Sequence, residues 1–208
     1  TEPQAGTDLG AIRTMATPNG DGTWSIKGQK IFITWGDHDV AENIVHLVLA
    51  RTPDAPEGSK GISLFVAPKF LPDASGNPGE RNAITTVSVE HKLGIHGSPT
   101  CVLEYEGATG FLVGELHGGL AGMFVMMNSA RVGMGLQATG ISDRAYQRAR
   151  AYAEERMQGA VLDRPDGTPI AEHPDVRRLL LSMASEIAAM RALGVYVGDL
   201  FDRATDAD

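Results

Sequence analysis

The sequence has very little cysteine: Cys101 is the only one among 208 residues. A single thiol excludes an internal disulfide framework and a zinc site built on cysteines, and it fits a reducing compartment. Basic residues are also in deficit, with 18 Lys and Arg against 26 Asp and Glu, a net charge of −8 and no basic block. This balance predicts that neither nucleic acid nor an anionic membrane is a partner.

Long hydrophobic runs and targeting features are missing as well. No stretch approaches the roughly twenty apolar residues of a membrane helix, and the opening "TEPQAGTDLG" has neither the basic nor the apolar region of a signal peptide. We therefore expect a cytoplasmic protein. The nucleophile elbow, the P-loop and the dinucleotide glycine fingerprint are also absent from the sequence. His91 and His96 form the closest histidine pair, and their spacing matches no common metal motif, so no metal site is expected.

The first half of the chain has the period of β-strands. Trp24 and Ile26, and then Ile31 and Ile33, recur at spacing two in "TWSIKGQKIFIT". Short apolar runs follow at intervals typical of a barrel or sandwich, in "NIVHLVLA", "GISLFVAP", "AITTVSVEHKLG" and "TCVLEYEGATGFLVG". Because no helical crossover separates these runs, an antiparallel β-barrel or sandwich is predicted rather than a parallel sheet.

The second half has the period of helices. No proline occurs between about Leu120 and Gln158, and apolar or small residues recur at three and four. A second helix is predicted from about Pro174, since proline suits a first helical turn. The predicted fold class is therefore α+β, with a β-barrel domain over residues 1–116 and two long antiparallel helices over residues 117–208. Two helices alone bury little apolar surface, so this half is expected to need further helices or another subunit, and the chain to be cut at both ends.

Four features are candidates for binding chemistry, and each has an ordinary structural alternative. The opening turn offers hydroxyls and backbone N–H groups to an anion, or is simply a helix-capping turn at Thr7 or Asp8. Phe32 and Thr34 share one face of a strand, which suits a flat heterocycle or any barrel wall. The third feature is an amide and a guanidinium three residues apart on one helix face, where the guanidinium would pair with a ligand phosphate or simply with a carboxylate of another helix. The fourth is an Arg–Gln pair at a helix end beside a loop, where the alternative is a salt bridge. These are Asn128 with Arg131, and Arg156 with Gln158.

Taken together, these segments resemble the acyl-CoA dehydrogenases in order and spacing. The segments that carry the resemblance are "TEPQAGTD", "GQKIFITWG", "KLGIHGSPTC", "MMNSARVGMG" and "YAEERMQG". Two others, "FLPDASGNPGERN" and "EHPDVRRLLL", resemble the branch that includes 3-methylmercaptopropionyl-CoA dehydrogenases. The resemblance covers essentially the whole chain. It implies a middle β-domain followed by the start of a C-terminal helical bundle.

The resemblance also implies roles for particular residues. Thr1, Gly6 and Thr7 would contact FAD, Phe32 would stack on the isoalloxazine ring where the family often has Trp, and Ile33 and Thr34 would line the flavin. Arg156 and Gln158 would reach the FAD of a neighbouring subunit. The acyl-CoA would be held by Thr7, Ser98, Asn128 and Arg131.

The implied reaction is α,β-dehydrogenation of an acyl-CoA thioester, with electrons passed to an electron-transfer flavoprotein by a homodimer or homotetramer. The catalytic glutamate is expected beyond Asp208. Some relatives carry it just before the arginine of "SAR", where this sequence has Ala130. No catalytic residue is therefore expected within the chain, which should be inactive by itself. Two alternatives stay open: an acyl-CoA oxidase, and a non-catalytic flavin or interaction module of the same fold.

Overall fold

The computed structural model describes residues 1–161 and 167–205. The chain divides into two compact units, Thr1–Val125 and Met126–Asp208, each of which is described by itself. The first unit holds every strand of the described residues, and the second holds a pair of long helices.

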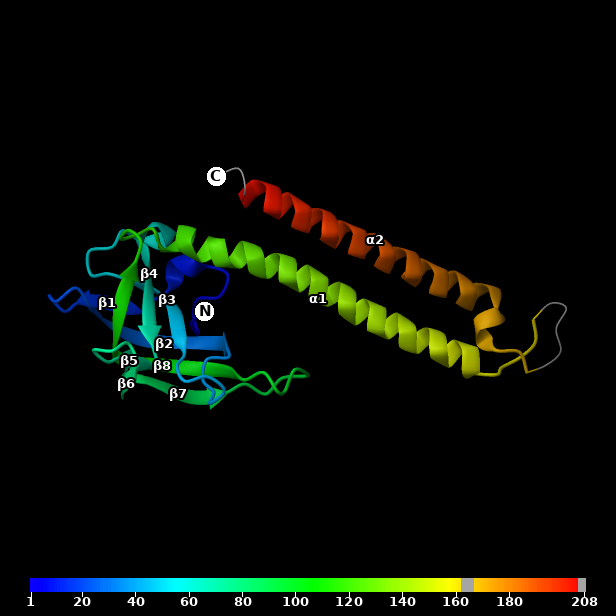
Figure 1. Ribbon diagram of the computed structural model, residues 1–208, viewed down its shortest axis with the longest axis horizontal. Helices are drawn as coiled ribbons and strands as arrows, with labels where there is room; N and C mark the ends of the chain where they lie inside the picture. The colour runs from blue at the N-terminus through cyan, green and yellow to red at the C-terminus, as the bar shows by residue number, and fades with distance from the viewer. Residues whose placement is uncertain (162–166, 206–208) are drawn as a thin grey trace. The chain divides into compact units, whose positions relative to one another are not determined.

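The first unit is a mixed sheet that closes on itself (Figure 1). Its strand order is β2-β1-β3-β4-β8-β7, and a further pairing between β2 and β8 completes a barrel-like arrangement. β5 and β6 form a separate two-stranded sheet. The strands are β1 (Met15–Pro18), β2 (Trp24–Thr34), β3 (Val45–Arg51), β4 (Ile62–Pro68), β5 (Phe70–Pro72), β6 (Pro78–Arg81), β7 (Ile84–Val89) and β8 (Thr100–Val113).

The ladders are antiparallel apart from a single parallel bridge between Met15 and Arg51. β8 closes the barrel because its early part pairs with β2 on one edge and β7 on the other, while residues 111–113 pair with β4. The predicted α+β fold class, with a β-barrel followed by helices, is confirmed.

The barrel core is made from alternate residues of these strands. Ile26, Phe65 and Leu103 are fully buried in one cluster, and the Trp24 ring packs on that of Phe65 with centroids 5.3 Å apart. Burying side chains of this size is the main favourable contribution to folding. The unit therefore has a core of its own.

The last residues of β2 depart from regular strand geometry. The ladder with β8 slips between Lys30 and Ile33, so that two residues on β2 oppose one on β8. Phe32, inside this bulge, has φ of 58°, a left-handed conformation that is an outlier for a bulky residue. The bulge also explains why the buried positions of β2 change from even numbers, such as Ile26 and Lys30, to the odd-numbered Ile33.

The second unit is an antiparallel pair of helices, as predicted, although the first of them begins within the first unit (Figure 1). α1 spans Gly119–Glu155 and α2 spans Pro174–Thr205, with a short 3-10 turn at Ile170–Glu172 before α2. Pro174 is the first residue of α2, where its missing N–H costs nothing. The turn-forming residues of "GAVLDRPDGTPI", residues 159–170, predict a loop between the two helices, and this segment lies partly outside the described residues.

The two helices cover only part of their apolar surface. The better-covered positions of α1 include four residues at a seven-residue spacing, which is typical of a helix–helix seam. They are Val132, Thr139, Tyr146 and Ala153. Large apolar side chains elsewhere are exposed, including Leu181 and Val195 of α2. Within the described part of the chain, α2 is the one helix whose length and composition would let it span a membrane, a property that core helices of soluble proteins share.

Candidate functional site

The opening segment forms a tight turn followed by a capped 3-10 helix. The backbones of Glu2 and Ala5 exchange two hydrogen bonds, and the Asp8 side chain caps Leu9–Ala11 by accepting from the Gly10 N–H at 3.0 Å. The structural alternative that the sequence allowed for Asp8 is therefore confirmed.

Gly6 lies between that turn and the cap, and protein packing does not require a glycine there. A Cβ added at Gly6 would meet no atom within 4 Å, and Gly6 lacks a positive φ. Gly6 and Thr7 are both exposed. The lack of a side chain leaves the Gly6 backbone open to a ligand, so the proposed role of this residue is sterically possible.

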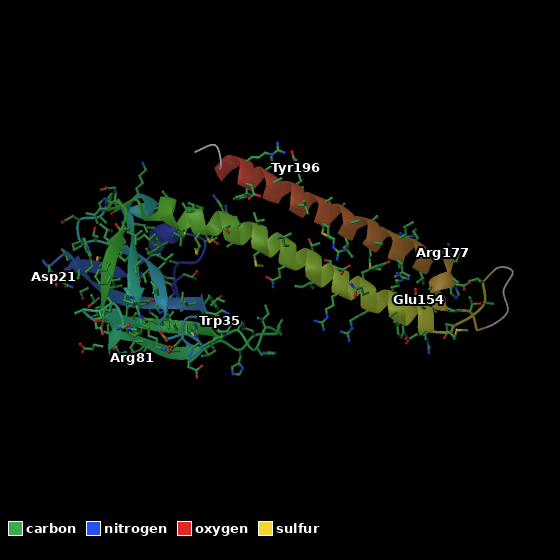
Figure 2. All side chains as sticks on the ribbon, viewed as in Figure 1. Asp21, Trp35, Arg81, Glu154, Arg177 and Tyr196 are labelled. Carbon is green, nitrogen blue, oxygen red and sulfur yellow. The ribbon has the colours of Figure 1, made fainter. Side chains whose placement is uncertain are left out.

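The end of β2 presents an aromatic ring and a hydroxyl on the exposed side of the barrel. Phe32 is 59% exposed and Thr34 is also exposed, whereas Ile33 between them packs against the core. Trp35, which follows and is labelled in Figure 2, also has a positive φ, of 56°. Strained residues of this kind cluster where ligands bind.

The structure brings Thr1 to this strand end. The Ile31 N–H donates to the Thr1 carbonyl at 3.0 Å, so the opening segment lies directly beside the bulge at Phe32. Two of the segments predicted to contact a flavin, distant in the sequence from each other, are thus neighbours.

Ser98 lies close to the same strand end. The Trp35 N–H donates to the Pro99 carbonyl at 2.7 Å, and Thr34 pairs with Thr100. A cavity of about 280 Å³ opens beside Ser98, and the Lys92 ammonium donates to the Ser98 carbonyl at 2.5 Å. The cavity is lined by Val89, Glu90, His91, Lys92, His96, Ser98 and Pro99. Its polar groups include two imidazoles, one ammonium group and one carboxylate, so it offers both donors and acceptors to a ligand.

Asp37 holds the segment that follows Thr34. Its carboxylate accepts from the Lys69 ammonium at 2.6 Å and from the Thr86 hydroxyl at 2.8 Å, with the Arg81 guanidinium 4.0 Å away. Burial acts to raise the pKa of Asp37, but these partners outweigh it and lower that pKa. Asp37 thus stays ionised and connects the exit of β2 to β7 and to Lys69, which lies between β4 and β5.

The remaining predicted residues lie in the second unit, whose geometry is described by itself. The Arg131 guanidinium donates to the Asn128 side-chain oxygen at 3.4 Å, as expected for one helix face. The Arg156 guanidinium donates to the Gln158 side-chain oxygen at 3.2 Å, just after α1 ends at Glu155. Gln158 is anchored because its N–H donates to the Thr168 carbonyl and its carbonyl lies 2.8 Å from His173 Nε2.

The first unit contains a buried ion pair that was not predicted from the sequence. Glu2 Oε1 lies 2.7 Å from Lys30 Nζ, and the two side chains are only 3% and 6% exposed. The signal was present in β2: Ile26, Gly28 and Lys30 continue one even-numbered inward face, and a lysine on such a face needs an acidic partner. No group of three or more His, Cys, Asp and Glu within residues 1–161 and 167–205 has the placement to hold a metal ion.

The ionisation of Glu2 predicts an acid-dependent loss of stability. Burial acts to raise the pKa of Glu2, but the Arg13 N–H, the Lys30 ammonium and the Thr14 hydroxyl outweigh it and lower the pKa from 4.5 to about 2. Because the folded pKa is depressed, the contribution is complete above about pH 4.5 and is lost as the pH falls toward about 2. This difference corresponds to about 3 kcal/mol.

Urea unfolding followed by tryptophan fluorescence measures this effect, since Trp24 and Trp35 both lie in the first unit and the chain has only two tryptophans. The double variant Glu2→Gln with Lys30→Met is the control, because it lacks the titrating carboxyl and leaves no buried ammonium without a counter-charge. We expect the wild type to lose stability over this pH range more steeply than the variant. Equal slopes would show that Glu2 does not titrate with a depressed pKa.

Comparison with known proteins identifies the family. Residues 1–108 match the family model "Acyl-CoA dehydrogenase, middle domain", and residues 117–207 match "Acyl-CoA dehydrogenase, C-terminal domain". The chain belongs to the acyl-CoA dehydrogenase family, whose members are flavoprotein oxidoreductases of fatty acid metabolism. It is 54% identical over 206 residues to 3-methylmercaptopropionyl-CoA dehydrogenase of Ruegeria pomeroyi, covering 98% of this chain and 35% of that protein.

Solved structures agree with this assignment. The chain is similar to Caenorhabditis elegans ACDH-11 in complex with C11-CoA, with a TM-score of 0.72, 30% identity, and coverage of 94% of this chain and 32% of that one. It is also similar to a chain from a structure described as the electron transferring flavoprotein of Acidaminococcus fermentans, with a TM-score of 0.80, 29% identity, and coverage of 98% and 48%. The chain spans about a third of the length of the curated relative named above.

Proposed function

We propose that this chain is the middle domain and the first part of the C-terminal domain of an FAD-dependent acyl-CoA dehydrogenase. The observation that carries the proposal is the strained, exposed end of β2, where Phe32 and Thr34 face outward beside Thr1. Family membership supports it. We propose a domain division at residues 116 and 117, which the ranges of the two family matches support.

The residues at this edge fit a flavin. Phe32 offers an exposed aromatic face to a flat ring, and the Thr34 hydroxyl lies on the same side of the strand. Thr1 would contact the ring, and the open backbone at Gly6 and Thr7 would donate to the pyrophosphate. Ile33 would support the ring from the core side. When bound, FAD supplies the hydride acceptor of the reaction, at N5.

Other residues would hold the acyl-CoA and complete the cofactor site. Ser98 and Thr7 would contact the substrate, and the ammonium and imidazole groups of the cavity beside Ser98 would offer hydrogen-bond donors to it, next to the Glu90 carboxylate. Asn128 and Arg131 would bind the CoA portion from the helical unit. We propose that Arg156 and Gln158 reach the FAD of a neighbouring subunit in a homodimer or homotetramer.

The reaction would be α,β-dehydrogenation, with the α-proton taken by a glutamate outside residues 1–208. The contribution of this chain would be to orient the ring and the thioester and to exclude water from them. We further propose that an electron-transfer flavoprotein accepts the electrons, which the similarity to the Acidaminococcus fermentans structure supports.

Replacing Thr34 by Ala in the full-length protein tests the proposed cofactor site. Thr34 is exposed and its side chain is not part of the core, so the fold should persist while FAD binding weakens by about 1 kcal/mol, or roughly fivefold. Thr85→Ala is the matched control, because Thr85 is an exposed threonine on β7, a strand of the same sheet that does not pair with β2. Isothermal titration of the apoprotein with FAD measures both. Equal losses in the two variants, or none in either, would count against a flavin at this strand end.

A further inference from the structure

The buried Glu2–Lys30 pair is a fully partnered polar network. The Glu2 carboxylate accepts from Lys30 Nζ at 2.7 Å, from the Thr14 hydroxyl at 2.6 Å and N–H at 3.1 Å, and from the Arg13 N–H at 2.7 Å. Lys30 Nζ also donates to the Leu49 carbonyl of β3 at 2.7 Å. The pair is thus bonded to β2, to β3 and to the segment before β1.

The pair lies next to the residues that are proposed to contact the flavin, which are Thr1, Phe32 and Thr34. Glu2 is adjacent to Thr1 in the chain, and Lys30 precedes Phe32 by two residues. The neighbouring connection is the hydrogen bond from the Ile31 N–H to the Thr1 carbonyl at 3.0 Å. A backbone hydrogen bond between Ile31 and Thr1 and the ion pair between Lys30 and Glu2 therefore hold the opening segment against the strained end of β2.

Stability alone is a poor explanation for a buried ion pair at this place. An apolar pair of similar volume is often as stable as a buried salt bridge, because both charges lose their hydration. The other even-numbered inward positions of β2 include Ile26 and Gly28, which carry no charge. What a charged, multiply bonded pair adds is a defined geometry. A strained residue such as Phe32 persists only where its surroundings fix it.

We propose that the Glu2–Lys30 pair positions the flavin-contacting residues, by holding the opening segment and the end of β2 at a fixed separation. Glu2 and Lys30 are positioning residues and do not touch the cofactor. The inference rests on the proposed function, since it assigns the pair a role toward the flavin that Thr1, Phe32 and Thr34 would contact.

The test uses the full-length protein and the double variant Glu2→Gln with Lys30→Met. The double substitution removes both charges, and the glutamine keeps one side-chain oxygen that can accept from the Thr14 N–H. The Arg13 N–H, which donates to the other carboxylate oxygen of Glu2, loses its acceptor. Ile26→Val is the control, a mild change at a fully buried position of the same strand. Tryptophan fluorescence verifies that each variant is folded, and FAD affinity, the shape of the flavin absorbance spectrum and the flavin reduction potential are then measured.

We expect the folded double variant to bind FAD about 10- to 100-fold more weakly, as when outer partners of metal ligands are removed, with a shifted spectrum and potential. Ile26→Val should match the wild type in all three. A folded double variant with wild-type affinity, spectrum and potential would overturn the positioning role alone. A wild-type protein that binds no FAD would overturn the proposed function and this inference with it.

If the double variant does not fold, Glu2→Asp decides the matter. This substitution keeps the charge but shortens the side chain by one methylene, so the opening segment must shift for the 2.7 Å contact with Lys30 to persist. We expect weaker FAD binding and an altered spectrum. Unchanged affinity and spectrum in a folded Glu2→Asp variant would contradict the proposal.

Discussion

A single Lys30→Met substitution is expected to lower the free energy of unfolding of the first unit by about 3–5 kcal/mol. The side chain of Glu2 is 3% exposed, so removing Lys30 leaves a buried carboxylate without its counter-charge. The stabilities of small proteins are only about 5–15 kcal/mol in total, so the variant would be close to unfolding at room temperature.

The double variant Glu2→Gln with Lys30→Met should recover a large part of that loss, because no unpaired charge is then buried. Lys27→Met is the matched control: Lys27 lies on the same strand but is exposed, so its replacement should change stability by less than about 0.5 kcal/mol. Urea unfolding at neutral pH, followed by the fluorescence of Trp24 and Trp35, measures all three. If Lys30→Met is no more damaging than Lys27→Met, the ion pair does not contribute as the structure indicates.

The second large effect concerns catalysis by the chain itself. With FAD and acyl-CoA supplied, residues 1–208 alone are expected to dehydrogenate the substrate at least about 10²–10⁴-fold more slowly than the full-length protein, the usual contribution of a general base. The proposal places the base outside this chain, and Ala130, the residue before Arg131, has no group that accepts a proton.

The comparison requires that the fraction of chain with FAD bound is measured, so that weak cofactor binding is not mistaken for slow chemistry. Reduction of the bound flavin by a panel of acyl-CoA thioesters, followed in a stopped-flow instrument without oxygen, gives the rate per bound flavin. A rate equal to that of the full-length protein would show that residues 1–208 contain their own base.

The architecture could be predicted from the sequence because it depends on local periodicity. The alternation in Trp24–Ile33 and the long proline-free stretch after Leu120 each indicate one kind of element over many residues. The start of α2 at Pro174 could also be predicted from the sequence, because proline is favoured at the first position of a helix. Closure of the barrel through β8, which pairs with three different strands, depends on contacts between distant residues that no local pattern encodes.

The candidate site could be predicted only in part, because it too depends on contacts between residues that are distant in the sequence. The sequence indicated that Phe32 and Thr34 share one face of a strand, but regular alternation does not predict the positive φ of Phe32 or the bulge around it. The contact between Thr1 and Ile31 joins residues far apart in the chain, and the pairing of Glu2 with Lys30 does likewise. The proposed contact of the Arg–Gln pair after α1 with the FAD of a neighbouring subunit stays a prediction, because it involves a second chain.

The central claim is that residues of this chain bind the FAD of an acyl-CoA dehydrogenase, and one measurement tests it most directly. The full-length protein is purified, its flavin absorbance is recorded, and acyl-CoA thioesters are added in the absence of oxygen. We predict a yellow protein whose oxidised-flavin absorbance bleaches with at least one thioester, and a Thr34→Ala variant in which less flavin is bound. A full-length protein that neither carries flavin nor takes up added FAD would contradict the account.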